Sequence, residues 1–559
     1  MSFLGSMKAH PLILATLGCF VAVALLGSAA GACSDPIVAP AEVQVGDRLF
    51  RETRFAQFFF NFITQNPKRN VNTPLVHGDP VMNNEQNAAG KPLRDPFRNQ
   101  SMNCRNCHLG NDLLGVSRFD GRTYCDFARR SPVPARSDGL LTTPRNAQLL
   151  VSVSAPREVP TLFHFDGEFA SIEDLTLGTL TGRNFGWLPS EFAQAEAHII
   201  NVIKNDDGKN ALARRYGCGG FPYSVVLKGT DPRLPKGLVL PAQYRIDVTT
   251  ATDDEILQAI GTLIHAYMDS IAFNLDEPPS PYDVFLTKNG LPTAPNPGES
   301  DIAYAQRLLG LINQLSSPKF VTPKDGIFKL HKQTFQFGAT ELEGLKVFFN
   351  QSGAEGVAGN CVACHLPPAF TDNLFHNTGV AQLEYDAIFS GGQFAALTVP
   401  DLNTRNANFD AYLPPSPNHP NASGMFRSPA SSDNPGFTDL GVWNIFANPD
   451  IPNPQTALTQ ILCAEFGLSG SNCTPETVLP MTIGFFKTPS LRDPAQSNPY
   501  MHNGSLDNLG EVLSFYNTVS TLAHNGLLRN PSPELANISF YNEVPALTAF
   551  LNALNEDYQ

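Results

Sequence analysis

The sequence predicts a mostly α-helical protein in which two domains of similar design carry loop-rich insertions. Three observations lead to this fold class. Apolar residues recur at helical spacing in several segments, whereas the alternation typical of strands is scarce. A five-residue pattern, C-x-x-C-H, occurs once in each half of the chain. The 559 residues include 46 Pro and 43 Gly, which indicates many irregular connections between the helices.

The C-x-x-C-H pattern is the attachment signal for c-type haem. Two thiols on one turn of backbone can add to the two vinyl groups of one porphyrin, and the His that follows reaches the iron. A zinc knuckle or a redox dithiol is the alternative, but a dithiol needs no His and a Cys/His zinc site takes four ligands close together. We therefore expect two covalently bound haem c groups in cytochrome-c-like domains, held by Cys104, Cys107, His108, Cys361, Cys364 and His365.

The N-terminal residues have the composition of an export signal. Lys8 precedes an apolar run over residues 11–32, and the run ends in Ala-Gly-Ala, the small residues of a cleavage site. The run is also long enough to span a bilayer, so an uncleaved anchor is the alternative. Cys33 follows directly and is a candidate for lipid modification, although Ala30 stands where such signals have Leu. We expect a periplasmic protein, with membrane attachment if Cys33 is lipidated.

Four further cysteines remain in the exported chain, an even number that suits an oxidising compartment. Cys463 and Cys473 are close enough in sequence for a local disulfide, and Cys125 with Cys218 would then form the long one, although spacing alone does not fix the pairing. The formal charge of −14 argues against nucleic acid as a partner and is compatible with a basic redox protein.

The domain boundaries follow from composition. We expect a signal peptide over residues 1–32, an N-terminal haem domain over 33–275, a linker over 276–324 and a C-terminal haem domain over 325–559. The linker is suggested by six Pro between residues 278 and 297. Residues 380–480 are rich in Asn and Pro, and we expect them to be a long irregular loop region that holds the local disulfide.

Several helices can be located from apolar periodicity and capping residues. An amphipathic helix is expected within residues 45–63, one that starts at Ser190 and runs to about residue 204, and one over 253–274. Ser171 with Asp174, Thr340 with Glu343, and Asn508 with Glu511 have the spacing of N-terminal caps. His198 and His265 are expected to be packed helix residues rather than ligands, and spacing alone makes Tyr516 a core aromatic residue.

Two further stretches, taken with the C-x-x-C-H sites, resemble a known family. The first is Phe-Thr-Asp at residues 370–372, followed by Phe-His-Asn-x-Gly at 375–379. The second is Thr-Pro-Ser-Leu-Arg at 488–492, followed by Pro-Tyr-Met-His-Asn-Gly at 499–504. In these motifs the chain resembles the bacterial dihaem cytochrome c peroxidase and MauG family. The resemblance covers nearly all of the chain after the leader, with insertions.

The resemblance implies a role for each site. The N-terminal haem would be the peroxide site, the C-terminal haem would handle electrons, and His108 and His365 would be proximal ligands. Glu191 would move a proton between the two peroxide oxygens; the alternative is that it only stabilises a helix N-terminus. His502 would lie near the interface between the haems. A calcium ion would be bound by Asn146 and the backbone oxygens of Ser497 and Pro499, all of them hard oxygen donors.

Three departures from the family pattern change these expectations. No His occurs between His108 and His164, so the first iron is expected to be open at rest. Phe165 stands where the family has a Trp that bridges the two haems. Electron transfer through an indole is therefore not expected here, unless Trp187 or Trp443 takes that role. Tyr516 stands where the peroxidases have a Met ligand of the second haem. A Tyr there is the MauG pattern, and a phenolate lowers the reduction potential of the iron. The competing ligand is Met501; Met102 is the weaker alternative.

These inferences predict an oxidoreductase that uses hydrogen peroxide as oxidant. Electrons would come from a small redox protein (a c-type cytochrome or a cupredoxin) or from an oxidisable protein or organic substrate. They would pass through the C-terminal haem to the N-terminal peroxidatic haem. The alternative is a non-catalytic dihaem electron-transfer protein. A third interpretation is a surface-anchored binding protein that keeps its haem structurally and uses residues 380–480 as its interaction surface.

Overall fold

The structure, a computed structural model, describes residues 39–78, 101–108, 136–140, 143–154, 160–217, 219–271, 280–328, 333–351 and 357–556. The expected signal peptide, Cys33 and the expected disulfide between Cys125 and Cys218 lie outside the described residues. All described residues belong to one compact unit, Ile37–Gln559. None of the helices that can be described is both long and apolar enough to cross a membrane.

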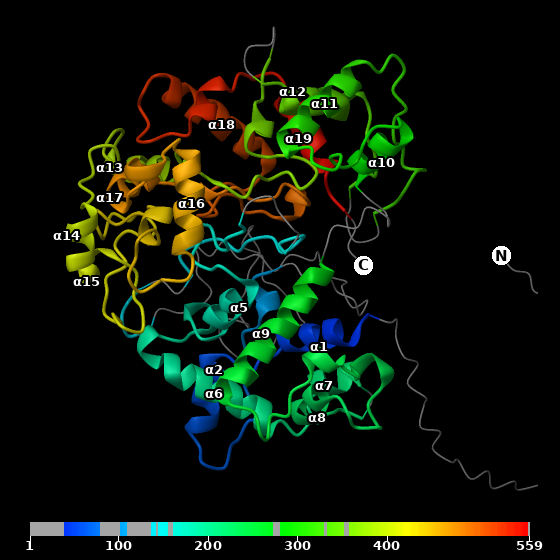
Figure 1. Ribbon diagram of the computed structural model, residues 1–559, viewed down its shortest axis with the longest axis vertical. Coiled ribbons are helices and arrows are strands. Elements are labelled where there is room, and N and C mark those ends of the chain that lie inside the picture. The colour runs from blue at the N-terminus through cyan, green and yellow to red at the C-terminus, as the bar shows by residue number, and fades with distance from the viewer. Residues whose placement is uncertain are drawn as a thin grey trace, which may run out of the picture. The chain divides into compact units, whose positions relative to one another are not determined.

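The described chain is mostly α-helical, as the sequence predicts (Figure 1). Its one named sheet is a short antiparallel pair, β1 (Phe375–His376) with β2 (Phe486–Lys487), in which Phe375 is opposite Lys487. The buried apolar residues form three large clusters, which we name the first, second and third cores.

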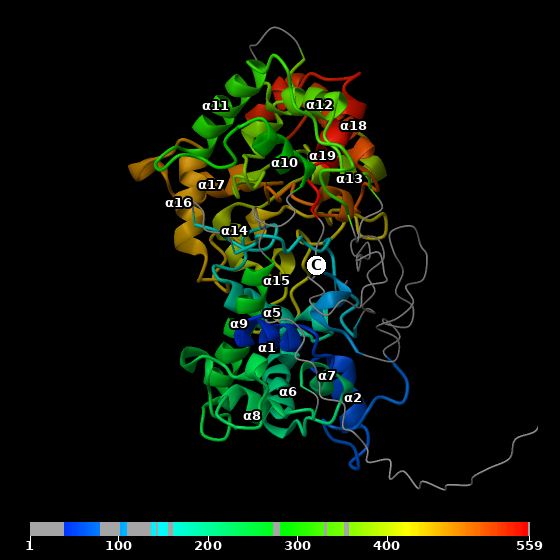
Figure 2. The same ribbon diagram turned by 90° about the vertical axis from the view of Figure 1, so that its right-hand side faces the viewer.

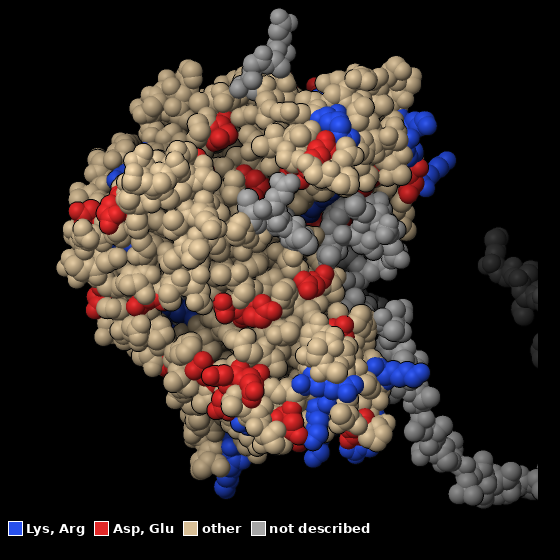
Figure 3. Space-filling view, viewed as in Figure 1, with Lys and Arg blue, Asp and Glu red and all other residues tan. Residues whose placement is uncertain are grey.

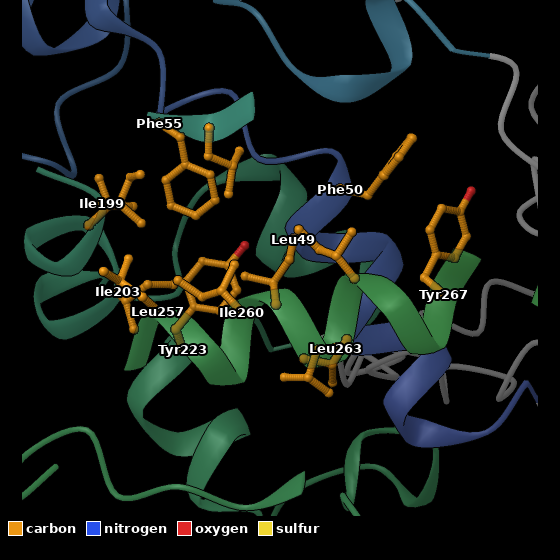
Figure 4. Close-up of a cluster of buried hydrophobic side chains, with 14 of the residues drawn as sticks. Leu49, Phe50, Phe55, Ile199, Ile203, Tyr223, Leu257, Ile260, Leu263 and Tyr267 are labelled. Atoms are coloured by element: carbon orange, nitrogen blue, oxygen red, sulfur yellow. The ribbon is translucent and has the colours of Figure 1, made fainter. Parts of the chain in front are cut away.

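The first core is built by helices that flank the first C-x-x-C-H motif in sequence. The long helix α9 packs across α1, and Figures 1 and 4 show the two side by side. Gly46 permits this contact, because a Cβ there would lie 2.0 Å from the carbonyl oxygen of Leu263. The helix expected within residues 45–63 is in fact two. The helices of this core are α1 (Ala41–Phe50), α2 (Gln57–Thr64), α5 (Ile172–Leu180), α6 (Phe192–Asn205), α7 (Ala211–Tyr216), α8 (Tyr223–Lys228) and α9 (Asp253–Ser270).

The second core repeats this arrangement around the second motif. The helix before the motif, α12 (Ala339–Phe349), packs against the last helix, α19 (Val544–Asn552), and both views show them adjacent (Figures 1 and 2). Gly344 lies at this crossing as Gly46 lies at the other, since a Cβ on Gly344 would be 1.9 Å from the carbonyl oxygen of Ala546. The helix α18 (Leu509–His524) completes the core through Leu509 and Leu513.

The segment expected to be a linker, residues 276–324, is folded in its described part, residues 280–324. It contains two helices, α10 (Pro281–Lys288) and α11 (Asp301–Asn313). Ser280 and Ser300 cap them, and Pro281 is at the first helical position, where its missing N–H costs nothing. Both helices bury aromatic residues in the second core, including Tyr282 and Tyr304. The Pro residues here therefore mark helix starts and turns within a packed region.

Residues 380–480 are also more ordered than the irregular loop region expected from composition. They form the third core, around the fully buried Trp443 and with the indole of Trp443 edge-on to Phe426. The expected disulfide between Cys463 and Cys473 is confirmed. The helices here are α13 (Val380–Phe389), α14 (Leu402–Ala407), α15 (Phe409–Tyr412), α16 (Gln455–Glu465) and α17 (Pro475–Val478).

Two of the predicted helix caps are confirmed and two are wrong. Ser171 accepts a hydrogen bond from the Asp174 amide, and Asn508 accepts one from the Glu511 amide, as expected. The cap expected at Thr340 is wrong: α12 starts earlier, and the Glu341 carboxylate accepts from the amide of Gly338. The cap expected at Ser190 is also wrong, because Glu191 is the residue before α6.

Candidate haem sites

The first C-x-x-C-H motif forms a tight turn that places both thiols together. Cys104 begins a short 3-10 helix, and the amides of Cys107 and His108 both donate to the Cys104 carbonyl at 3.1 Å. Among the described cysteines only Cys463 and Cys473 form a disulfide. Burial raises the pKa of the Cys104 thiol to about 12, so this sulfur is neutral in an apolar setting. The geometry suits thioether bonds to one porphyrin.

His108 is prepared to be an iron ligand. Its Nδ1 lies 2.8 Å from the carbonyl oxygen of Gln148 and donates its proton there. This hydrogen bond fixes the tautomer in which Nε2 carries the lone pair, the form that coordinates iron. Burial lowers the pKa of His108 to about 4, which keeps the imidazole neutral.

The first motif opens onto a cavity of about 520 Å³. That volume is within the range of cofactor sites. Trp187 is a fixed part of the wall, since its indole N–H donates to the carbonyl oxygen of Phe55 at 3.2 Å. The lining is mainly aromatic and apolar, which fits a porphyrin, and includes Phe50, Met102, Phe163, Phe165, Trp187, Ile264 and Met268.

Part of the same cavity is lined by residues that are distant in sequence. They come from the third core and include Phe409, Pro414, Pro415, Arg427, Asn448 and Asp450. Sequence reasoning missed this wall. No local pattern in residues 409–451 indicates it, because it depends on how two parts of the chain pack against each other.

The second motif has the same turn in a different setting. The His365 amide donates to the Cys361 carbonyl at 2.9 Å, and Nδ1 of His365 lies 3.1 Å from the carbonyl oxygen of Phe370. Tyr516 of α18 lies beside this motif. Burial raises the pKa of Tyr516, and the neighbouring thiols of Cys364 and Cys361 raise it further. The structure therefore brings Tyr516 to the second motif, as its expected role requires.

Glu191 lies at the edge of the first cavity but is engaged elsewhere. Its carboxylate accepts from Arg136 at 2.7 Å and from the amide of Leu188 at 2.9 Å. Pro189 and Phe192 line the cavity on either side of it, whereas Glu191 is not among the lining residues. The contacts seen are those of a residue that stabilises a helix start. Its expected catalytic role stays a prediction.

Two of the three expected calcium ligands are brought together. The side-chain amide nitrogen of Asn146 lies 2.5 Å from the carbonyl oxygen of Pro499 and 3.3 Å from that of Met501. Ser497 donates from its hydroxyl to Asp493. Because the nitrogen of Asn146 faces these carbonyls, a calcium ion would require the amide to rotate and present its oxygen. The calcium site stays a prediction.

His502 lies close to the wall of the first cavity. Its ring stacks on Phe486 with the centroids 3.6 Å apart, and the ring of Phe165, which lines the cavity, is 6.4 Å away. The backbone at His502 is hydrogen-bonded to the N-terminal half of the chain, since the Asn146 N–H donates to the His502 carbonyl at 2.7 Å. Burial lowers the pKa of His502 to about 4, so its ring is neutral.

Of the two helix histidines, His198 is packed as expected, whereas His265 is 31% exposed. His198 is buried, and its Nε2 lies 2.7 Å from the carbonyl oxygen of Arg54. Nδ1 of His265 lies 2.7 Å from the carboxylate of Glu173. Neither residue lines the first cavity.

Sequence reasoning also missed a charged network on the cavity wall. His164 contacts Glu168 in the same loop, and Arg427 of the third core contacts Glu168 in turn. Next to this pair, Arg145 bridges Asp166 at 2.5 Å and Asp439 at 2.6 Å. His164, Glu168, Arg145 and Arg427 all line the cavity.

Comparisons with known proteins support the family resemblance. No family model matches the chain. Two curated proteins of Denitromonas iodatirespirans are similar to it: cytochrome-c peroxidase IdrP1, 55% identical over 42 residues, and cytochrome-c peroxidase IdrP2, 26% identical over 198 residues. The matches span 11% and 36% of those proteins and 8% and 35% of this chain. The site and fold thus define a mostly α-helical protein with two C-x-x-C-H motifs.

Within that class, the chain resembles the dihaem cytochrome c peroxidase and MauG family, as its motifs predict. Two solved structures are also similar over 94% of the chain, each at 16% identity and a TM-score of 0.40. One is the diheme peroxidase BthA from Burkholderia thailandensis E264, of which 88% is covered. The other is a MauG-like protein associated with microbial copper homeostasis, of which 91% is covered.

Proposed function

We propose that this chain is an exported dihaem c-type oxidoreductase that uses hydrogen peroxide as oxidant. The first haem site would take the peroxide, and the second would pass electrons to it. The observation that carries the proposal is the difference between the sites: His108 opens onto a cavity of about 520 Å³, whereas the second motif has Tyr516 beside its thiols. The curated relatives named cytochrome-c peroxidases support the class.

The residues that would hold the two haem groups are the paired cysteines and the His of each motif. When bound, haem supplies the iron at which peroxide is reduced and a path for electrons. The carbonyl oxygens of Gln148 and Phe370 hold His108 and His365 in the ligand tautomer. The aromatic residues of the first cavity wall provide an apolar surrounding, which would strengthen polar interactions with a bound peroxide.

We propose that Tyr516, together with His365, would hold the iron of the second haem. The Tyr516 ring is half-buried against the second core and its pKa is raised, so deprotonation requires a cation beside it. A ferric iron would supply that charge. With this ligand the second site would favour the oxidised state, which suits oxidation of a protein or organic substrate as well as electron uptake from a c-type cytochrome or cupredoxin.

The external electron donor is proposed to be a small redox protein with a basic docking face. Asp and Glu number 52 against 38 Lys and Arg. On the face shown in Figure 3, several groups of acidic side chains are exposed. Complementary charge would increase the rate of association with such a partner and make it salt-dependent. We also propose a periplasmic location and one bound calcium ion at Asn146.

The proposal is tested by mixing the fully ferric protein with stoichiometric peroxide and recording optical and EPR spectra. Prompt loss of the ferric signals without prior reduction is expected if the first site is open and the second shares the oxidation. A reaction that requires one-electron reduction first would contradict Tyr516 ligation and leave an ordinary peroxidase. Inertness in both states would contradict the use of peroxide and favour the electron-transfer protein.

A further inference from the structure

We infer that His164, oriented by Glu168, is the residue that accepts and returns the peroxide proton in the first cavity. The inference rests on the proposed function and names a catalytic residue for it. His164 and Glu168 both line the cavity that His108 lines. They are held side by side by a short loop, which is closed by a hydrogen bond from the Phe163 amide to the Phe169 carbonyl at 2.8 Å.

The hydrogen bond between the two residues determines the tautomer of His164. Nδ1 lies 2.9 Å from Oε2 of Glu168, and an ionised carboxylate only accepts, so Nδ1 carries the proton. Nε2 then has the lone pair and makes no hydrogen bond to the described part of the chain. The imidazole side chain is 30% exposed, which leaves it accessible to a small molecule in the cavity. A carboxylate behind an imidazole also stabilises the ring when it gains a proton.

Surrounding charges keep Glu168 ionised. Burial alone would raise the pKa of Glu168, but Arg427 and His164 outweigh it and hold the pKa below its usual range. Arg427 reaches Glu168 from the third core and also lies 3.2 Å from Asp166. The pair of His164 and Glu168 is therefore held by its own loop and by Arg427, which is distant in sequence.

The same charges argue against a metal ion among His164, Asp166 and Glu168, although their ligand atoms lie within 4.8 Å of one another. The guanidinium groups of Arg145 and Arg427 already contact the two carboxylates. The three carboxylates of this network, Asp166, Glu168 and Asp439, are thus already paired with two guanidinium groups. A divalent cation would have to displace an arginine, whereas an imidazole that gains and loses one proton would not.

The proposed step conserves atoms and charge. Nε2 of His164 takes a proton from one oxygen of H2O2 and returns it to the other oxygen, which leaves as water when the O–O bond breaks. The two electrons come from the donor named above, and two protons from solvent complete the reduction of H2O2 to two water molecules. His164 ends each turnover as it began. Glu191 is less suited to this step, because Arg136 and the Leu188 amide occupy its carboxylate.

The test compares His164→Leu with His265→Leu in the ferric holoprotein. His265 is a matched control, since it forms the same kind of pair with Glu173 at 2.7 Å, is 31% exposed and does not line the cavity. The first readout is the association rate of hydrogen cyanide, which must lose its proton to bind iron as the anion. The second is the rate of reaction with peroxide. His164→Gln, which keeps a polar side chain of similar size but accepts no proton, is the second variant.

We expect both His164 variants to slow cyanide association and peroxide reaction by roughly 100-fold, the usual contribution of a general base. The control should match the wild type, with haem content unchanged in all proteins. Cyanide association at the wild-type rate in both His164 variants would overturn the inference. If cyanide association depends on His164 while the wild type ignores peroxide, His164 is the proton acceptor of the cavity, but the proposed peroxide function fails and with it the transfer of a peroxide proton. If the wild type binds neither, both are overturned.

Discussion

The turn at Cys104 and the turn at Cys361 have the same hydrogen bonds and different surroundings. In both, the His amide donates to the carbonyl of the first Cys, and Nδ1 of the His faces a backbone carbonyl. In the first region α1 crosses α9 at Gly46, and in the second region α12 crosses α19 at Gly344. The first turn, however, opens onto a cavity partly lined by the third core, whereas the second has Tyr516 beside it.

If both motifs bind haem as proposed, the difference teaches that attachment and reactivity are specified by separate parts of the chain. Five consecutive residues suffice for the turn and the His ligand. The space in front of that ligand depends on remote residues, Arg427 at the first site and Tyr516 at the second. Two sites with the same motif can therefore perform different reactions, and changes to each set of residues should separate them.

The largest effect is expected from removing one pair of attachment cysteines. Cys104→Ser with Cys107→Ser should remove the first haem and all rapid reaction with peroxide, while the second site keeps its optical signature. Cys361→Ser with Cys364→Ser should leave the first haem in place. Haem content by the pyridine haemochrome method, with stopped-flow peroxide mixing, checks both. Rapid peroxide reaction in the first double variant would reverse the assignment of the two sites.

A large loss of stability is expected from breaking a buried ion pair of the second region. Arg492 binds Asp283 of α10 at 2.9 Å, and both side chains are at most 3% exposed. Asp283→Ala should lower the free energy of unfolding by about 3–5 kcal/mol, because it leaves a buried charge without its partner. Urea denaturation measures this.

The pair between Lys288 of α10 and Asp325, whose side chains are 31% and 27% exposed, provides the control. Asp325→Ala should cost less than about 1 kcal/mol. Equal costs for the two variants would show that α10 is not an integral part of the second core and would restore the linker that composition suggested.

An intermediate effect is expected from Tyr516→Phe. Loss of a phenolate ligand should raise the reduction potential of the second haem on the order of 100 mV, equivalent to about 2 kcal/mol, and leave the first potential unchanged. Spectroelectrochemical titration resolves the two haems. Tyr385→Phe, at a buried tyrosine of the third core, is the control and should shift neither potential. An unchanged second potential in Tyr516→Phe would exclude the phenolate ligand.

The smallest effect concerns Glu384, which contacts the residue after His502. Burial raises the pKa of Glu384 to about 7, although a hydrogen bond from Asn503 acts to lower it. The folded chain thus holds a proton that the unfolded chain releases, so stability falls as the pH rises from about 4.5 to 7 and then levels off. Glu384→Gln should gain on the order of 1 kcal/mol at pH 8 and nothing at pH 4.

Urea midpoints at the two pH values measure this gain. Glu476→Gln, at an exposed glutamate, is the matched control and should change neither midpoint. A gain of the same size at pH 4 and pH 8 would mean that the carboxyl is not the source of the pH dependence.

Local features of this structure could be predicted from the sequence. The turns at the two C-x-x-C-H motifs, the caps at Ser171 and Asn508 and the disulfide at Cys463 each depend on residues within about ten positions of one another. The position of Tyr516 beside the second motif was expected only from the family resemblance, because its helical spacing is also that of a core residue.

Features that depend on long-range packing could not be predicted. Pro-rich composition suggested a linker at residues 276–324, but Pro281 begins a helix, and two helices of this segment bury aromatic residues in the second core. Residues 380–480 were expected to be a loop region because they are rich in Asn and Pro, yet their short helices pack into the third core. The contact between Arg427 and Glu168 joins residues far apart in sequence, and neither residue's neighbours indicate the other.

The wall that residues 409–451 contribute to the first cavity has a consequence for how the protein is made. A chain is synthesised from its N-terminus at about 5–20 residues per second, so roughly 20–70 s separate His108 from the last residue of that wall. During this interval the residues of the first motif exist and those of the wall do not. Fragments that end before residue 409 should aggregate through the apolar surface that this wall would cover.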